Sequence, residues 1–217
     1  MAEPFVFRTQ QQLVVLTGRR ARNLEELLEH VRNAPGASIF YHTHYLYLTQ
    51  HFVTPKFYNE FAGWVSQALL ERRLAERIGA IDLLSVSSLR ELRDRIAGEI
   101  EVYLQETQGK LRDAPAGEEF QFCEAKSFVF PNGLVAHDVP EFFRCLPLIS
   151  NACLHFHIFE SRLRLEKPTN DFSFWLTDNG EKKLAAAIDN LNPYVVSLDE
   201  LKAQIYKIGR RYARANS

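Results

Sequence analysis

The sequence has few cysteines and no excess of charge of either sign. The three cysteines, Cys123, Cys145 and Cys153, form an odd set without a Cys-x-x-Cys pair, which argues against a disulfide framework and a zinc ribbon. The 26 Lys and Arg residues nearly balance the 27 Asp and Glu residues, so the net charge is -1. Such a chain has no bulk field to attract nucleic acid or an acidic membrane surface. We therefore expect neither as a partner.

Long apolar runs and the common catalytic motifs are also missing. No apolar run approaches the roughly 18 residues of a membrane-spanning helix, and the first residues lack the basic and apolar regions of a secretory signal. The chain contains no P-loop, no G-x-G-x-x-G after a strand, no G-x-S-x-G and no H-E-x-x-H. The hydrophobic content of 46% is that of a globular protein. We expect a folded cytoplasmic protein, and the sequence leaves open whether it is an enzyme.

Two stretches of the sequence match each other. The segment His42-x-His44 matches His155-x-His157 at a spacing of 113 positions, and residues 59–64 (NEFAGW) match residues 170–175 (NDFSFW) at 111. The second match aligns the only two Trp residues of the chain. Other matches continue on both sides, and their spacing falls steadily from 115 to 109. This pattern indicates a tandem duplication.

The predicted fold class is mainly α, with tandem duplicated helical units packed about a pseudo-twofold axis. The first repeat unit covers 1–108, a polar linker with Gly and Pro covers 109–117, and the second unit covers 118–217. The sequence leaves open whether the two units have separate cores or share one core. An α+β variant would add short strands at the start of each unit, with Phe5–Arg8 facing Leu13–Leu16 and Phe120–Cys123 facing Ser127–Phe130 across turns.

Helix starts are marked by capping residues. Asn23 precedes Leu24–Arg32, whose apolar residues recur at helical spacing, and Asp138 precedes Val139–Leu146. Asn59 and Asn170 are expected to cap the next helices, each followed by an acidic residue that favours the positive end of the helix dipole. Further helices are predicted over Leu74–Ile81 and Leu184–Leu191 and after Ser88 and Ser197. The His-bearing segments should end at Pro55 and Pro168.

The conformation of the His-x-His segments decides what they can do. On a strand, residues i and i+2 share a face and can hold one metal ion, whereas on a helix they lie about 200° apart. The surrounding residues favour a helix. His42 and His155 then lie on the more apolar sides, and His157 lies beside Glu160 and Ser161. We expect His42 and His155 to be the inward pair, brought together by the pseudo-twofold axis.

Three interpretations of the histidines stay open. The first is a pair of core histidines, each hydrogen-bonded to a neighbour. The second is a site for a divalent transition metal such as zinc, iron or manganese. The third is a pocket for an organic ligand. The candidate metal ligands are His42, His155, Glu60 and Asp171. The candidate ligand-contacting residues are His42, His44, Tyr45, His155, His157, Phe159 and Arg162.

A basic turn offers a further candidate site. Residues 18–22 (GRRAR) precede the Asn23 cap, so that guanidinium groups and a helix N-terminus could bind a phosphate. The matching residues 133–137 (GLVAH) contain no Arg. The alternative is a solvated basic turn.

Several of these segments together resemble a known family. Phe-x-Phe near the start, TGRRARNLEELLEHVR over Thr17–Arg32, Tyr41-His42 and PTNDFSFWL over Pro168–Leu176 are similar to domain of unknown function 5752, an uncharacterised bacterial and archaeal family. The resemblance spans nearly the whole chain and implies no activity. The favoured function is a non-catalytic binding or regulatory module, with a surface for a small molecule or partner protein between its units. The alternative is an enzyme with a His/carboxylate, metal-dependent site. The oligomeric state is left open.

Overall fold

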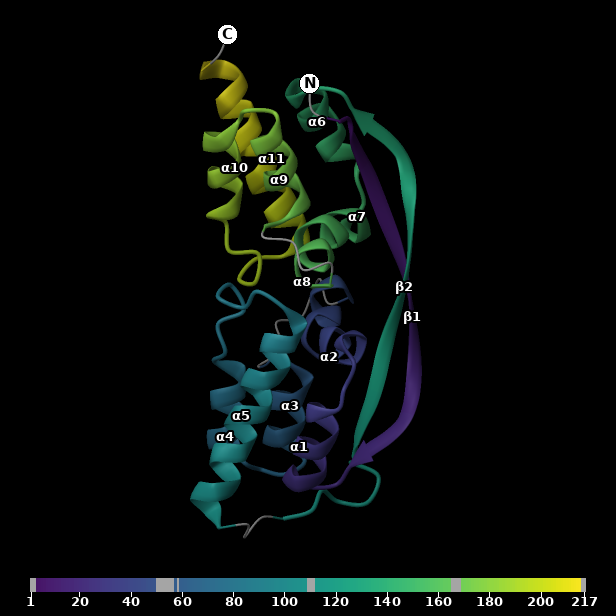
Figure 1. Cartoon of the computed structure of the whole chain (residues 1–217), viewed down its shortest axis with the longest axis vertical. Helices are drawn as coiled ribbons and strands as arrows, with labels where there is room; N and C mark the ends of the chain where they lie inside the picture. Colours follow the sequence, from purple (N-terminus) through teal and green to yellow (C-terminus); the bar gives the residue numbers. More distant parts are fainter. Residues whose placement is uncertain (1–2, 50–56, 58, 109–111, 165–168, 216–217) are drawn as a thin grey trace. The chain divides into compact units, whose positions relative to one another are not determined.

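The computed structural model describes residues 3–49, 57, 59–108, 112–164 and 169–215. The described residues are mainly helical. Two antiparallel strands, β1 (Phe5–Ala21) and β2 (Phe120–Ala136), form a two-stranded sheet (Figure 1). Pro55 and Pro168, which were expected to end the His-bearing segments, lie outside the described residues.

The predicted short strands and turns were wrong. Each expected pair of short strands is one continuous strand of 17 residues, and the two long strands pair with each other. The polar residues 9–12 (TQQQ) contain no Gly or Pro, so nothing in them turns the chain. Gly18 and Gly133 do adopt positive φ angles, +78° and +87°. Glycine reaches this region without steric cost, and the strands continue past both positions.

The prediction of tandem helical units packed about a pseudo-twofold axis is also corrected. The chain divides into two compact units, one made of Gln12–Lys126 and the other of Met1–Gln11 with Ser127–Ser217. A strand of 17 residues extends about 56 Å, whereas the longest helix, with 19 residues, spans about 28 Å. Each strand is therefore long enough to contribute to both units. Whether repeats begin and end at the predicted boundaries stays a prediction.

The unit of residues 12–126, called here the α1–α5 unit, contains the first five helices. They are α1 (Leu24–Arg32), α2 (Gly36–Thr49), α3 (Glu60–Gln67), α4 (Arg72–Gly79) and α5 (Leu89–Thr107). Helix α1 has the predicted bounds, and Asn23 accepts a hydrogen bond from the Glu26 backbone N–H as its cap. Asn59 caps α3 and Ser88 caps α5 in the same way. These predictions are confirmed.

The other unit, called here the α6–α11 unit, contains the remaining helices. They are α6 (Val139–Cys145), a 3-10 turn (Leu146–Leu148), α7 (Asn151–His155), a π-helical turn (Phe156–Glu160), α8 (Ser161–Arg164), α9 (Asp171–Asp178), α10 (Lys182–Asp189) and α11 (Leu198–Ala215). Asp138 and Asn170 cap α6 and α9 as predicted. The His-x-His segments are helical in both units, which is also confirmed.

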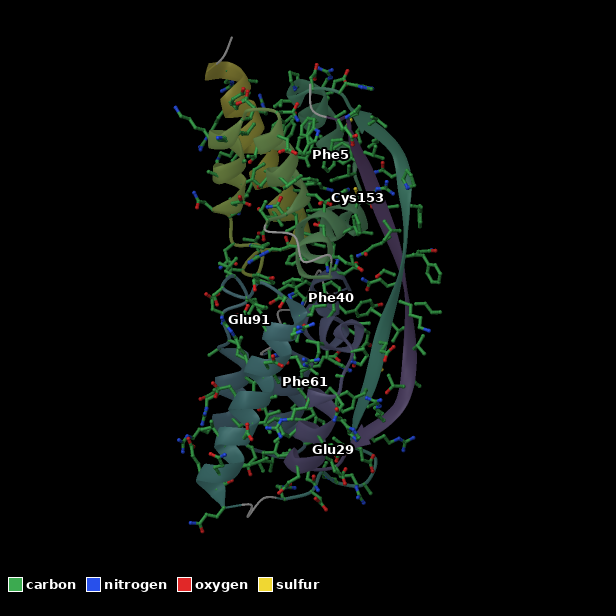
Figure 2. All side chains as sticks on the ribbon, in the orientation of Figure 1. Phe5, Glu29, Phe40, Phe61, Glu91 and Cys153 are labelled. Atoms are coloured by element: carbon green, nitrogen blue, oxygen red, sulfur yellow. The ribbon has the colours of Figure 1, made fainter. Side chains whose placement is uncertain are left out.

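The first residues of each strand lie in an aromatic core. Phe5 and Phe7 of β1 contact the rings of Phe142, Phe172 and Trp175 in the α6–α11 unit. Phe120 and Phe122 of β2 contact Phe61 in the α1–α5 unit, and Phe120 also contacts Trp64. Phe5 and Phe61 are labelled in Figure 2. Each helical unit is thus completed by a strand segment from the opposite half of the sequence.

The two Trp side chains hold the chain just before each strand. The Trp175 indole N–H donates to the backbone oxygen of Glu3 at 2.7 Å, and that of Trp64 donates to Glu118 at 2.6 Å. Glu3 and Glu118 each lie two residues before the strand begins. An indole N–H that is shielded from water needs a hydrogen-bond acceptor, and here the backbone oxygen just before each strand supplies it.

Candidate functional site

His42 links helix α2 to both a carboxylate and a strand. Its Nδ1 lies 2.6 Å from Glu60 Oε2, and the backbone N–H of Cys123 donates to its Nε2 at 3.0 Å. The side chain is buried, with 1% of the residue exposed. Because Nε2 accepts a hydrogen bond, Nδ1 carries the proton and donates to Glu60. Both ring nitrogens are therefore occupied.

His157 makes contacts of the same form in the α6–α11 unit. Its Nδ1 lies 2.8 Å from Asp171 Oδ2, and the backbone N–H of Arg8 donates to its Nε2 at 2.9 Å. The residue is 2% exposed. Again the imidazole is the Nδ1–H tautomer, placed between a carboxylate at a helix start and a backbone N–H of a strand.

This arrangement answers a backbone requirement of the sheet. In a two-stranded sheet, every second N–H of each strand points away from the partner strand and needs another acceptor if it is buried. The Nε2 atoms of His42 and His157 are those acceptors for Cys123 and Arg8. The carboxylates of Glu60 and Asp171 hold each ring in the required tautomer and orientation. The histidines thus attach the strands to the helices.

The other two histidines are also buried but have different partners. The Thr43 hydroxyl lies 2.7 Å from His44 Nδ1, and the ring of His44 stacks on Phe40. His155 Nδ1 lies 3.0 Å from Gln10 Nε2, and its ring lies against Phe159. Both histidines are 0% exposed. Their local partners come from helix α2 in the first case and from β1 in the second.

The structure pairs some of the predicted site residues within each compact unit. His42 pairs with Glu60, and His157 pairs with Asp171. His42 and His155, the expected inward pair, belong to different compact units and have their own partners there. His155 and His157 are both buried, so these two histidines do not divide into an inward one and an outward one. The spacing of apolar residues in the sequence does not reveal that both histidines are buried. The segment contains a π-helical turn, and every residue of that turn is buried.

The described residues add no third metal ligand to either His/carboxylate pair. Within the described ranges, no group of three or more His, Cys, Asp or Glu side chains is placed to hold a metal ion. A transition-metal site needs three or four ligands with open lone pairs. Metal binding by His42, His155, Glu60 and Asp171 stays a prediction.

The aromatic candidates lie beside the histidines. Tyr45 stacks on Tyr41 with ring centroids 4.9 Å apart. Burial, helped by the negative charge of Glu60, raises the pKa of Tyr41 to about 12. Phe159 is buried and contacts the ring of Tyr194, and Arg162 is half-buried. A role in ligand recognition for Tyr45, Phe159 and Arg162 stays a prediction.

The basic turn carries less free positive charge than its sequence suggests. Arg22 forms an ion pair with Glu26 at 2.8 Å, and this pairing holds the pKa of the Glu26 carboxyl below its ordinary value. A cavity of about 510 Å³ beside the turn is lined by Arg20, Arg22 and His30, but also by three acidic residues, Glu26, Glu29 and Glu119. Acidic groups at this density oppose phosphate binding.

A larger cavity, which the sequence did not reveal, lies in the α6–α11 unit. It has a volume of about 1040 Å³ and lies between α6, the turn before α10 and the C-terminal half of α11. Its apolar lining includes Pro140, Phe143, Pro147, Tyr206 and Tyr212. Its charged lining consists of Asp138, Arg144, Glu181 and Arg210. Drug-sized ligands occupy cavities of about 300–1,000 Å³, so this one is large enough for a small organic molecule.

One sequence signal does mark this cavity. Gly209 lies inside helix α11, where glycine costs about 1 kcal/mol relative to alanine. A Cβ atom at this position would overlap the ring of Phe143. The glycine therefore allows the Phe143 ring to lie against the helix backbone at the cavity wall. A glycine within a helical pattern indicates such close packing, although it does not indicate the partner.

None of the described helices is long and apolar enough to cross a membrane. The cytoplasmic location stays a prediction.

Comparison with known proteins supports the resemblance to an uncharacterised family. The family of unknown function DUF5752 matches residues 2–210. The solved structure of OrfY from Thermoproteus tenax is similar to this chain, with a TM-score of 0.85 and 27% sequence identity over 96% of this chain and 95% of that chain. No curated protein sequence matches significantly.

Proposed function

This chain belongs to the family of unknown function DUF5752, and for it we propose the function of a non-catalytic binding protein that holds a small organic molecule in the cavity between α6 and α11. The observation that carries the proposal is the cavity itself. It combines an apolar wall with a few charged groups in about 1040 Å³, which is the general composition of a small-molecule site.

The histidine contacts support binding over catalysis. A general base or a metal ligand needs an imidazole nitrogen with an open lone pair. In His42 and His157 the only lone pair, on Nε2, accepts a backbone N–H from a strand. The His/carboxylate pairs therefore resemble catalytic pairs in composition, but their contacts are those of structural links. This reasoning weighs against the enzyme interpretation.

The cavity can be tested by changing its wall. Gly209→Ala places a methyl group where the Phe143 ring lies, so the ring must shift, and the part of the wall that it forms must change. Gly98→Ala is the matched control, because Gly98 is also inside a long helix, α5, and a Cβ there would meet no atom within 4 Å. The probe is N-phenyl-1-naphthylamine, an uncharged aromatic molecule whose fluorescence rises in apolar surroundings.

We expect the wild type and Gly98→Ala to bind this probe with the same affinity, and Gly209→Ala to bind it at least about tenfold more weakly. Circular dichroism spectra of the variants establish that each is folded. Equal probe binding by Gly209→Ala and the wild type would contradict the proposal, because the probe would then occupy some other surface, such as the exposed Phe128 and Phe130 of β2.

A further inference from the structure

Resting on the proposed binding function, we infer that the α6–α11 cavity selects organic anions, with an aromatic or aliphatic body against Phe143 and Tyr206 and an acidic group at Arg144 and Arg210. The inference comes from the different states of the four charged residues that line the cavity. Two are acidic and two are basic, so the formal charges cancel. The acidic and basic side chains differ, however, in the hydrogen bonds that they already make within the unit.

Both acidic residues already accept hydrogen bonds from within the unit. Asp138 caps α6, and its Oδ1 accepts the backbone N–H of Glu141 at 2.7 Å. Glu181 accepts the hydroxyl hydrogen bond of Tyr212. A carboxylate that is held in this way has part of its charge satisfied by a local donor. Each carboxylate is therefore oriented by a donor from its own unit.

The two arginines are much less engaged. Arg144 has one ion pair, with Glu141 at 3.4 Å, and its side chain is 66% exposed. Exposed ion pairs of this kind contribute little and exchange readily for water or another anion. The Arg210 guanidinium makes no ion pair or hydrogen bond with any residue in the described ranges. The guanidinium N–H donors of these two arginines are thus the weakly engaged charged groups of the cavity.

Guanidinium groups suit carboxylate, sulfonate and phosphate groups because their N–H donors match the oxygen geometry. The apolar part of the wall lies close by, since Phe143 and Arg144 are neighbours on α6 and Tyr206 and Arg210 are one helical turn apart on α11. Helices α6 and α11 each contribute one arginine and at least one aromatic ring. A ligand with an acidic group and a hydrophobic body satisfies both kinds of contact at once.

The test compares two probes that differ in one group. 8-Anilinonaphthalene-1-sulfonate carries a sulfonate on nearly the same aromatic body as N-phenyl-1-naphthylamine, which has none. Each probe is titrated into the wild type, into the Arg144→Gln/Arg210→Gln double variant and into Arg211→Gln. Arg211 is an exposed neighbour of Arg210 that does not line the cavity, so its variant controls for the loss of charge from the same helix.

We expect the wild type and Arg211→Gln to bind the sulfonate probe about tenfold or more tightly than the neutral probe. The double variant should bind both with the affinity of the neutral probe, and added salt should weaken only sulfonate binding. Equal affinities for the two probes in the wild type, with both lost in Gly209→Ala, would overturn the anion preference and leave the proposed function standing. Binding of both probes that survives Gly209→Ala would overturn the proposed function itself.

Probes with a carboxylate and with a phosphate in place of the sulfonate then separate the acid classes. Tighter binding of the phosphate member in the wild type, absent from the double variant, would assign a phosphorylated ligand. Tighter binding of the carboxylate member would assign a carboxylic acid. A preference that persists in the double variant would overturn the assignment of Arg144 and Arg210 as the anion contacts.

Discussion

The substitution His42→Phe tests whether the imidazole attaches strand β2 to the helices. The variant would keep an aromatic ring of similar size in the core, but that ring would have no polar atoms. The backbone N–H of Cys123 would lose its acceptor, and Glu60 would lose the donor at 2.6 Å. Cys123 is a buried residue, so water cannot readily replace the lost acceptor.

The expected cost follows from these two losses. An unsatisfied buried N–H costs about 1–3 kcal/mol. The hydrogen bond to Glu60 adds less than a fully buried one, because the Glu60 side chain is 30% exposed and water can solvate it after the change. The free energy of unfolding should therefore fall by about 2–4 kcal/mol. For a chain of this length that corresponds to a fall in Tm of roughly 5–15 °C.

Urea denaturation measures the total effect, and amide hydrogen exchange locates it. Exchange of the Cys123 amide should accelerate in His42→Phe, and more than exchange in the core of helix α5. The control is His137→Phe, at an exposed histidine, which should change stability by no more than about 0.5 kcal/mol. Wild-type stability of His42→Phe together with unchanged protection of the Cys123 amide would refute the structural role, and would reopen a catalytic or metal-binding role for this residue.

Three further outcomes follow from the structure. Cys145 is half-buried, whereas Cys123 and Cys153 are buried, and burial raises the pKa of Cys153 to about 12. Ellman's reagent at pH 8 should therefore label one thiol rapidly in the native protein and three in urea. Rapid labelling of three thiols in the native protein would contradict the burial of Cys123 and Cys153. Hydrogen bonds from neighbouring groups lower the pKa of Glu91 to about 2 from an ordinary 4.5, so Glu91 stabilises the fold above about pH 4.5 and loses that contribution as the pH falls toward 2. The Tm difference between wild type and Glu91→Gln should therefore shrink over that range, and a constant difference would contradict the assignment. Asn170→Ala removes the α9 cap and should lower the free energy of unfolding by about 1–2 kcal/mol in urea titrations; an unchanged midpoint would contradict the capping role.

Local signals in the sequence predicted the helices well. Asn23, Asn59, Ser88, Asp138 and Asn170 each cap the helix that they were expected to cap. Capping depends on a side-chain oxygen and a backbone N–H two or three residues later, so both partners are visible in a short stretch of sequence. The family assignment likewise came from motifs along the chain and is confirmed.

The strands were harder to predict because their partners are distant. Segments 5–8 and 13–16 were expected to pair across a turn, but they are parts of one strand whose partner begins at Phe120. Strand pairing depends on which segment is available to form the ladder, and local alternation does not reveal this. The π-helical turn at Phe156–Glu160 similarly changed which faces of that segment are buried.

The candidate site also combines features that the sequence predicted with features that only the folded chain revealed. Sequence matching placed an acidic residue after each capping Asn and a histidine pair before it, and these acids do contact histidines: Glu60 pairs with His42, and Asp171 pairs with His157. The sequence did not reveal that a backbone N–H from the opposite half of the chain occupies the remaining nitrogen. It also contained no direct sign of the cavity, whose walls come from α6 and α11, more than 50 positions apart along the chain.

The helices with their caps, the family and the residue types at the histidine sites could all be read from the amino-acid sequence, because each depends on contacts between near neighbours or on motifs along the chain. Three features required the folded chain: which strand completes which helical unit, which atom fills each histidine lone pair, and where an apolar wall meets two weakly engaged arginines. Those features depend on contacts between residues distant in sequence, and such contacts leave no local pattern.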